Sequence, residues 1–177
     1  QTRIAYKNKV KEEIAKEIVT EYTLNGRKQY GMSTRLTFSF THPTDKGMIH
    51  RLRGNLISLF SPLQTLFAEK LMQSWSDVAN ISYSKSSGDD DVNIGFYNFF
   101  QESSLAGIAN FPNHSKFGVV NINRFYGSNN SPTYLNFGGH VLAHEIGHSF
   151  GLIHTHNLKN TPKHQQHTQQ VSIMSYR

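Results

Sequence analysis

Cysteine is absent from this chain, and so is any long apolar run. Without cysteine the chain forms no disulfide bonds and offers no thiolates as metal ligands. Without about 20 consecutive apolar residues it has no helix that could span a membrane. The sequence also shows no signal peptide and begins with Gln1 instead of Met, which suggests a processed or recombinant boundary.

Internal repeats and low-complexity linkers are missing as well, so residues 1–177 are predicted to form a single domain. A chain of this length can bury a sizeable core. Apolar residues recur at helical spacing between Val10 and Ile18 and predict an amphipathic helix over about 7–22. Residues 1–30 are therefore expected to be an N-terminal helical segment, either an appendage of the domain or a remnant of a prosegment.

Acidic residues are scarce, with 12 Asp and Glu against 18 Lys and Arg, so the net charge is +6. A basic chain can bind nucleic acid or an acidic surface. Here the positive residues are scattered, with short groupings only at 7–11 and 51–53, and there is no RNP-like motif or zinc-finger spacing. This distribution favours a solvated basic surface and no nucleic-acid partner.

The segment from His144 to His154 reads HEIGHSFGLIH, a HExxHxxGxxH motif. His144 and His148 are four residues apart, so on a helix both imidazoles lie on one face and can reach the same cation. Glu145 lies about 100° further round, close enough to hold a water molecule at the metal without ligating it. Gly151 can adopt a positive φ and end the helix, so that His154 arrives as a third ligand. Three neutral imidazoles and one water form an open, catalytic zinc site.

The motif could also occur without a catalytic role, by chance or as a structural zinc site, and both alternatives are less favoured. The chain holds 10 histidines, so one helical pair could arise by chance, but the five fixed positions together are far less expected. A structural zinc site is normally closed by four protein ligands and favours cysteine. We therefore expect one catalytic zinc ion.

Other polar clusters are weaker candidates for a metal site. His140 lies one turn before His144, but the motif already supplies three ligands, so a surface or supporting role is favoured. The run Asp89–Asp91 lacks the spaced oxygen ligands of a calcium loop, so a solvated turn is favoured over a calcium site.

A second motif follows the first, because Ser172-Ile173-Met174-Ser175-Tyr176 is typical of a Met-turn. HEIGHSFGLIH followed by SIMSY resembles the serralysin branch of the metzincin zinc proteases. Residues 71–81 are also similar to the serralysin helix-to-strand junction, and the likeness covers roughly 34–177. The resemblance implies that Met174 forms a soft floor beneath the three histidines and that Tyr176 is a switchable fifth zinc ligand.

The chain departs from the serralysin pattern in three respects. Serralysins usually have proline after the third histidine, where this chain has Thr155. They usually continue into a calcium-binding repeat domain, and no GGxGxD repeat occurs here. The chain stops one residue after Tyr176, whereas metzincins usually continue into a segment that walls the S1′ pocket. The family member is either minimal or a fragment or nicked product.

The resemblance implies an α+β fold like the metzincin catalytic domain. A twisted mixed sheet of about five strands, mostly parallel, packs on two long helices. The zinc cleft separates an upper, sheet-bearing part from a small lower part. Local patterns place a helix over about 48–78, interrupted at Ser61-Pro62, with a buried stripe of Leu63, Leu66, Phe67, Leu71 and Trp75. They place strands at 34–40, 81–85, 92–97, 105–111 and 117–124, a loop at 126–137 and the start of the motif helix near Phe137-Gly138.

The resemblance also implies an antiparallel edge strand beside the cleft, assigned by its order along the chain to about 106–111. The exposed N–H and C=O groups of such an edge bind an extended peptide by β-augmentation, largely independently of side chains. The substrate-binding residues expected there are Gly107, Ile108, Ala109 and Asn110.

These observations predict a secreted, monomeric zinc endopeptidase that cleaves proteins or peptides. Glu145 would take the proton of the attacking water and pass it to the leaving amine, and Tyr176 would donate a hydrogen bond to the oxyanion. A proteinaceous inhibitor or the prosegment would be a further partner. The alternative is a non-catalytic or inhibited peptide-binding module with the same fold; a nucleic-acid binder with incidental zinc is a more distant one.

Overall fold

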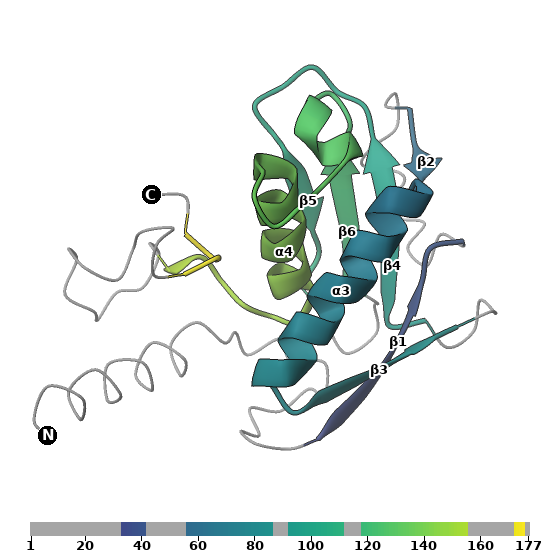
Figure 1. Cartoon of the computed structure of the whole chain (residues 1–177), viewed down its shortest axis with the longest axis vertical. Coiled ribbons are helices and arrows are strands. Elements are labelled where there is room, and N and C mark those ends of the chain that lie inside the picture. Colours follow the sequence, from purple (N-terminus) through teal and green to yellow (C-terminus); the bar gives the residue numbers. More distant parts are fainter. Residues whose placement is uncertain (1–32, 42–55, 87–91, 112–117, 156–171, 176–177) are drawn as a thin grey trace, which may run out of the picture.

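A computed structural model describes residues 33–41, 56–86, 92–111, 118–155 and 172–175 of the chain. These residues form one mixed sheet with two helices on one of its faces (Figure 1). The predicted helix over 7–22 lies outside the described residues. In chain order the elements are β1 Thr34–Ser39, β2 Ser58–Leu59, α3 Pro62–Val78, β3 Ile81–Lys85, β4 Ile94–Phe99, β5 Gly107–Ala109, β6 Gly118–Asn123, the 3₁₀ helix η1 Gly127–Asn130 and α4 Phe137–Ser149.

The sheet has the strand order β3-β1-β4-β6-β5, and β2 pairs separately with β4. Strands β3, β1, β4 and β6 are parallel, while β5 runs antiparallel to β6 at one edge. The predicted α+β metzincin-like fold, with a mixed and mostly parallel sheet, is therefore confirmed. In the described part of the chain, no helix combines the length and apolar character needed to cross a bilayer.

Strands β4 and β6 lie at the centre of the sheet and are buried at every position. Successive side chains point to opposite faces of a strand. Phe96 and Ile122 therefore face the helices, whereas Phe99 and Val119 pack in a smaller cluster with Ile108 on the other face. Burial on both faces is typical of the inner strands of a parallel sheet, and here it includes three asparagines, Asn98, Asn121 and Asn123.

Helix α3 begins later than the sequence pattern predicted. The helix was expected from about 48, but residues 56–61 are not helical, and Ser58–Leu59 forms strand β2 against β4. Proline disfavours the helical conformation in the residue before it, so Pro62 can begin a helix but not continue one. Ser61 caps the helix: its Oγ accepts from the Gln64 N–H at 3.3 Å, and Gln64 Oε1 accepts from the Ser61 N–H at 2.9 Å. Residues 48–55 lie outside the described part of the chain.

The buried face of α3 also differs from the predicted stripe. Leu63 and Leu66 are 62% and 52% exposed, whereas Phe67 and Leu71 are buried as predicted. Gln64 lies in the core instead, because its Nε2 donates to a side chain of β4 and to a main-chain carbonyl of η1, each at 2.8 Å. A glutamine with satisfied hydrogen bonds can thus occupy a core position that an apolar stripe would assign to leucine.

Helix α4 begins at Phe137, as predicted, and is capped by Asn136, whose Oδ1 accepts from the Gly139 N–H at 2.9 Å. Every residue from Gly138 to Ser149 is buried, with the exception of His140. The first turn of the helix lies directly against loop backbone: a Cβ atom at Gly139 would collide with the Thr133 carbonyl oxygen. The two glycines at this end therefore allow α4 to enter the core.

Gly139→Ala is expected to destabilise the domain by about 1–3 kcal/mol, although alanine favours helices over glycine by about 1 kcal/mol. The reason is the collision with main-chain atoms of Thr133, which cannot rotate away. Urea unfolding measures the change. Gly127→Ala is the matched control, because a Cβ there meets nothing within 4 Å. Equal unfolding midpoints for both variants would contradict the packing argument.

Candidate active site

Three histidine side chains converge at the C-terminal end of α4. His144 and His148 lie one helical turn apart, and Gly151, with φ of 94°, turns the chain so that His154 returns to the same place. The Nε2 atom of His154 is 3.1 Å from that of His144 and 2.9 Å from that of His148. Among the described residues these three form the one group of His, Cys, Asp or Glu side chains that could hold a metal ion.

Main-chain carbonyls orient two of the rings. His144 Nδ1 donates to the Ile173 carbonyl at 2.7 Å, and His148 Nδ1 donates to the Leu152 carbonyl at 2.6 Å. A neutral ring that carries its proton on Nδ1 has a lone pair on Nε2. The lone pairs of both rings are therefore directed at one point, an arrangement that a bound cation stabilises.

This donor set fits zinc. Tetrahedral coordination at Zn–N distances of about 2.0–2.1 Å separates ligand nitrogens by roughly 3.4 Å, close to the observed spacing. Burial lowers the pKa of His148, although its hydrogen bond to Leu152 opposes the shift. A neutral imidazole is the form that binds a metal.

The carboxylate of Glu145 lies between α4 and strand β5. Its side chain is buried, and a Cβ atom at Gly107 would lie 2.9 Å from Oε1, so only glycine allows this approach. Burial raises the pKa of Glu145 to about 8, and a hydrogen bond from the Ala109 main chain opposes the shift. A nearby cation would favour the carboxylate and lower the pKa again.

Two hollows meet at Glu145. One, of about 360 Å³, is lined by Ser104, Leu105, Ala106, Gly107, Phe137, His140, Val141, His144 and Glu145. The other, of about 350 Å³, is lined by Leu105, Gly107, Ile108, Ala109, Phe111, Glu145, His148, Ile153 and His154. The histidine cluster thus borders a cleft that runs along β5, which is the shape an extended ligand requires.

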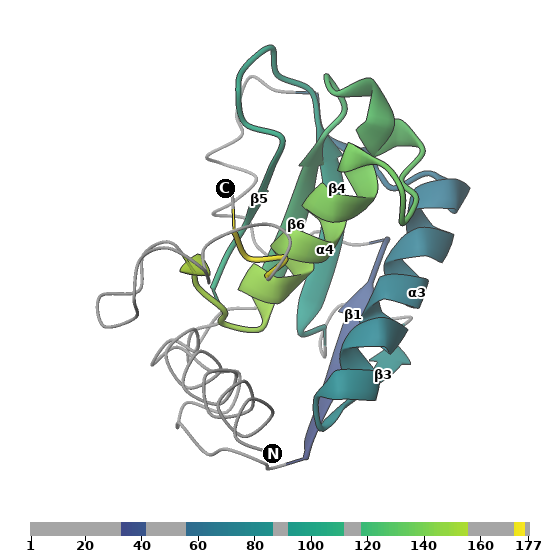
Figure 2. The same ribbon diagram turned by 60° about the vertical axis from the view of Figure 1, so that its left-hand side comes forward.

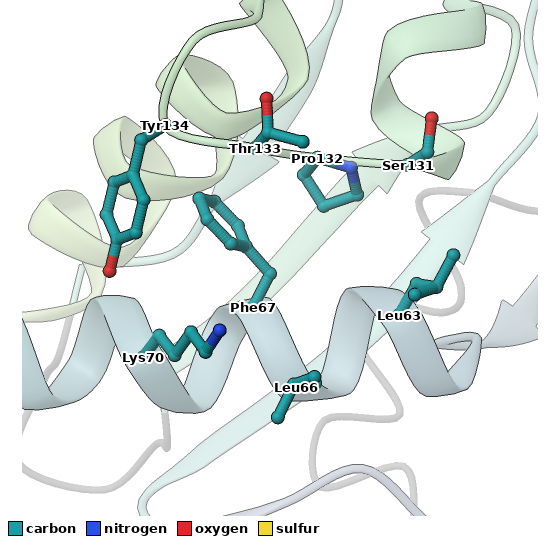
Figure 3. A pocket seen from close by; sticks show the side chains of 8 residues that line it. All are labelled: Leu63, Leu66, Phe67, Lys70, Ser131, Pro132, Thr133 and Tyr134. Carbon is teal, nitrogen blue, oxygen red and sulfur yellow. The ribbon is translucent and has the colours of Figure 1, made fainter.

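A further hollow lies apart from this cleft, between α3 and the loop before α4 (Figure 3). Phe67 and Tyr134 both line it, and their rings meet edge-on, with centroids 4.8 Å apart. It shares no lining residue with the two hollows beside Glu145. This hollow is therefore not part of the candidate site.

The segment 172–175 passes beside α4 (Figure 2) and forms a tight turn, in which the Ser175 N–H donates to the Ser172 carbonyl at 3.1 Å. Met174 is buried, and its Sδ atom lies 2.5 Å from where a Cβ of Gly147 would be. Met174 therefore packs directly against the helix that carries two of the histidines.

Thr155, where serralysins usually have proline, is buried and bonded to this turn. Its N–H donates to the Met174 carbonyl at 3.1 Å. Proline has no N–H and could not make this bond. The departure from the family pattern thus adds a link between the third histidine and the Met-turn.

Some residues that the sequence analysis considered are not part of the histidine cluster. Tyr176 and the run Asp89–Asp91 lie outside the described residues. His140 lines the first hollow, with its ring centroid 6.3 Å from that of His144, and burial lowers its pKa.

Phe111 ends the segment 106–111 that was expected to form the edge strand, but it was not among the substrate-binding residues expected there. Its ring meets that of His148 edge-on, with the ring centroids 5.4 Å apart. It is separated from the motif by more than thirty positions of sequence, and no local pattern marks it. Only the pairing of β5 with β6 brings it to the cleft.

Comparison with known proteins agrees with this geometry. Residues 31–177 match the sequence model described as Metallo-peptidase family M12. The chain is 31% identical to Serralysin A of Dickeya chrysanthemi over 168 residues, which cover 86% of this chain and 34% of that protein. It is 29% identical to Serralysin G of the same organism over 170 residues, or 87% of this chain and 35% of that protein. It is 32% identical to Metalloprotease AprA of Pseudomonas entomophila (strain L48) over 155 residues, 80% of this chain and 32% of that protein.

The chain spans about a third of the length of these curated relatives. The family match nevertheless covers most of the chain, including both the histidine motif and the Met-turn. The sheet, the buried motif helix and the histidine cluster are those expected of a metzincin. The chain therefore belongs to metallopeptidase family M12, as a serralysin-like metzincin catalytic domain.

Proposed function

We propose that this chain is a zinc-dependent endopeptidase that hydrolyses peptide bonds in proteins. The observation that carries the proposal is the convergence of three imidazole Nε2 atoms beside a buried carboxylate, at a cleft that follows an edge strand. His144, His148 and His154 would hold the zinc ion. At this position the bound ion would supply Lewis-acid chemistry, which polarises a carbonyl and lowers the pKa of an attacking water.

Glu145 is proposed as the general base and acid. It follows His144 directly in the helix, yet its carboxylate turns toward β5 and both hollows, where a substrate would lie. The hydrogen bond with Ala109 fixes its position. From there it accepts a proton from the attacking water and delivers it to the leaving amine.

Strand β5 is proposed to bind the substrate backbone, through residues Gly107 to Asn110. The Asn123 N–H donates to the Ala106 carbonyl, and the Asn110 N–H donates to the Val119 carbonyl. Main-chain groups of an antiparallel strand point alternately toward and away from the neighbour. Those of Gly107 and Ala109 therefore point away from β6, toward the cleft. The Ala109 donor already holds Glu145, and the other groups can pair with an extended peptide.

Tyr176 is proposed as a fifth ligand that moves to donate a hydrogen bond to the oxyanion. The support is its position two residues after Met174, together with the burial of Met174 beneath α4. The serralysin likeness also supports action outside the cell by a monomeric domain comprising residues 1–177, with a prosegment or proteinaceous inhibitor as a partner. Calcium binding has no support among the described residues.

The competing proposal is a peptide-binding module without activity. Zinc analysis together with casein hydrolysis separates the two. We expect about one zinc per chain, and hydrolysis that is lost with a chelator and restored by zinc. A zinc-loaded protein that binds peptides but cleaves none would support the binding module instead.

Glu145→Gln should retain zinc and lose activity by about 10²–10⁴-fold, because the amide keeps the shape of the side chain but accepts no proton. Zinc content and kcat/KM on a fluorogenic peptide measure the two effects. Full turnover by the zinc-loaded variant would rule out Glu145 as the base.

His154→Ala should weaken zinc binding and activity together, because the variant loses the one ligand that lies beyond the helix. Competition with a chromogenic chelator measures the zinc affinity. His140→Ala is the matched control for zinc affinity, since its ring lies near His144 but outside the cluster. If His154→Ala binds zinc as tightly as the parent, the third ligand lies elsewhere.

Tyr176→Phe should lower kcat by roughly 10²–10³-fold, the usual cost of one oxyanion donor, with little change in zinc affinity. Three histidines still hold the metal without the phenol hydroxyl. Steady-state kinetics and zinc titration decide the matter, and an unchanged kcat would show that Tyr176 only packs near the site.

A further inference from the structure

The segment that leads into β5 is held by side chains, not by regular strand pairing. Residues 101–106 contain no helix or strand. Four of their main-chain carbonyls nevertheless accept hydrogen bonds from the side chains of Asn123, Tyr126 and Asn129. We call these three side chains the clamp.

Asn123 makes the most hydrogen bonds of the three side chains in the clamp. Its Nδ2 donates to the Gln101 carbonyl at 2.8 Å and to the Leu105 carbonyl at 2.7 Å. Its Oδ1 accepts from the Gln101 N–H and the Phe125 N–H, each at 3.1 Å. The side chain is fully buried. Three of its four side-chain hydrogen bonds therefore hold the two ends of the segment, and the fourth holds Phe125.

Asn129 fixes the next residue. Its Nδ2 donates to the Ala106 carbonyl at 3.0 Å and to the Asn123 carbonyl at 2.8 Å. Its Oδ1 is buried and has no hydrogen-bond partner among the described residues, so the side-chain hydrogen bonds that an alanine at this position removes are all donated by Nδ2. Gln64 in α3 donates to the Asn129 carbonyl at 2.8 Å, which ties the clamp to the core. Tyr126 completes the clamp, because its hydroxyl donates to the Ser103 carbonyl at 2.9 Å.

The residues held in this way form the wall of the cleft. Leu105 lines both hollows beside Glu145, Ala106 lines one of them, and Gly107 begins the strand whose main-chain groups face the cleft. A displacement of the carbonyl at 105 or 106 would move that strand relative to the carboxylate. The side chains of the clamp line neither hollow, so they act on the cleft through the main chain that they hold.

From this geometry we propose that Asn123, Tyr126 and Asn129 are positioning residues that set the affinity for extended peptide substrates. The proposal rests on the function proposed above. The side chains hold the main chain of 101–106, and through it the start of β5, at the distance from Glu145 at which a substrate strand can pair with β5. They act through β5 and not through the metal, so their loss should weaken the binding of long substrates and leave zinc binding intact.

The test compares Asn129→Ala with Asn130→Ala. Asn130 is the adjacent residue, and its hydrogen bonds to Arg124 lie on the surface. Each variant is assayed on a long fluorogenic peptide that spans β5 and on a short one that reaches only the scissile bond. Asn129→Ala should raise KM for the long peptide about tenfold, with kcat and zinc content close to those of the parent. The short peptide and the Asn130→Ala variant should show little change.

Tyr126→Phe provides a second variant, because it removes one hydrogen bond without leaving a cavity. It should raise KM for the long peptide by up to about fivefold. Unchanged KM for the long peptide in both Asn129→Ala and Tyr126→Phe would overturn the proposal. An equal loss on long and short peptides would do the same, since it would indicate general damage to the fold.

Amide hydrogen exchange over residues 101–111 separates this proposal from the proposed function. Exchange there should be faster in Asn129→Ala than in the parent and in Asn130→Ala, whether or not the protein cleaves peptides. If the parent has no peptidase activity, the proposed function fails. Amide hydrogen exchange then tests by itself whether the clamp holds the strand. Exchange that does not change in this segment would overturn the positioning role in either case.

Discussion

Helix α4 is buried from Gly138 to Ser149 apart from His140, and it carries two imidazoles and a carboxylate into the interior. Buried polar groups are costly unless they find partners, so each of these side chains requires a specific neighbour. The neighbours are carbonyls for the two imidazoles and a main-chain group of β5 for the carboxylate. At the start of the helix, loop backbone approaches Gly138 and Gly139 where a Cβ would collide, and near its end Gly147 leaves room for the Met174 side chain.

The partners of the site come from distant parts of the chain. The Ile173 carbonyl, which orients His144, belongs to the turn beneath the helix, and Gly107, which makes room for Glu145, belongs to the edge strand. The same turn accepts a hydrogen bond from Thr155. A change in any of these segments therefore moves a ligand or the base, although none of them contributes a reacting group.

The histidine cluster could be predicted from the sequence because its spacing is local, and the general architecture could be predicted because the chain resembles the metzincins. His144 and His148 must share a helix face, and Gly151 is suited to the positive φ that it adopts. The buried face of α3 was predicted less well. Leu63 and Leu66 are exposed and Gln64 is buried, since hydrogen bonds to β4 and η1 compensate the glutamine amide. The spacing of apolar residues in a sequence contains no information about hydrogen bonds that offset the burial of a polar side chain. Residues 56–61, predicted to be helical, instead include a strand because β4 offers them a pairing partner.

By itself the sequence determined which groups could bind a metal and where the motif helix begins, because helical geometry relates residues a few positions apart. Only the tertiary structure decided what surrounds them. Which main-chain groups of β5 face the cleft depends on the register of β5 with β6. The hydrogen bonds that hold residues 101–106 come from the side-chain amides of Asn123 and Asn129, about twenty positions later in the sequence. Such contacts join segments whose separation in the sequence carries no periodic signal, so they exist only once the sheet and both helices have packed together.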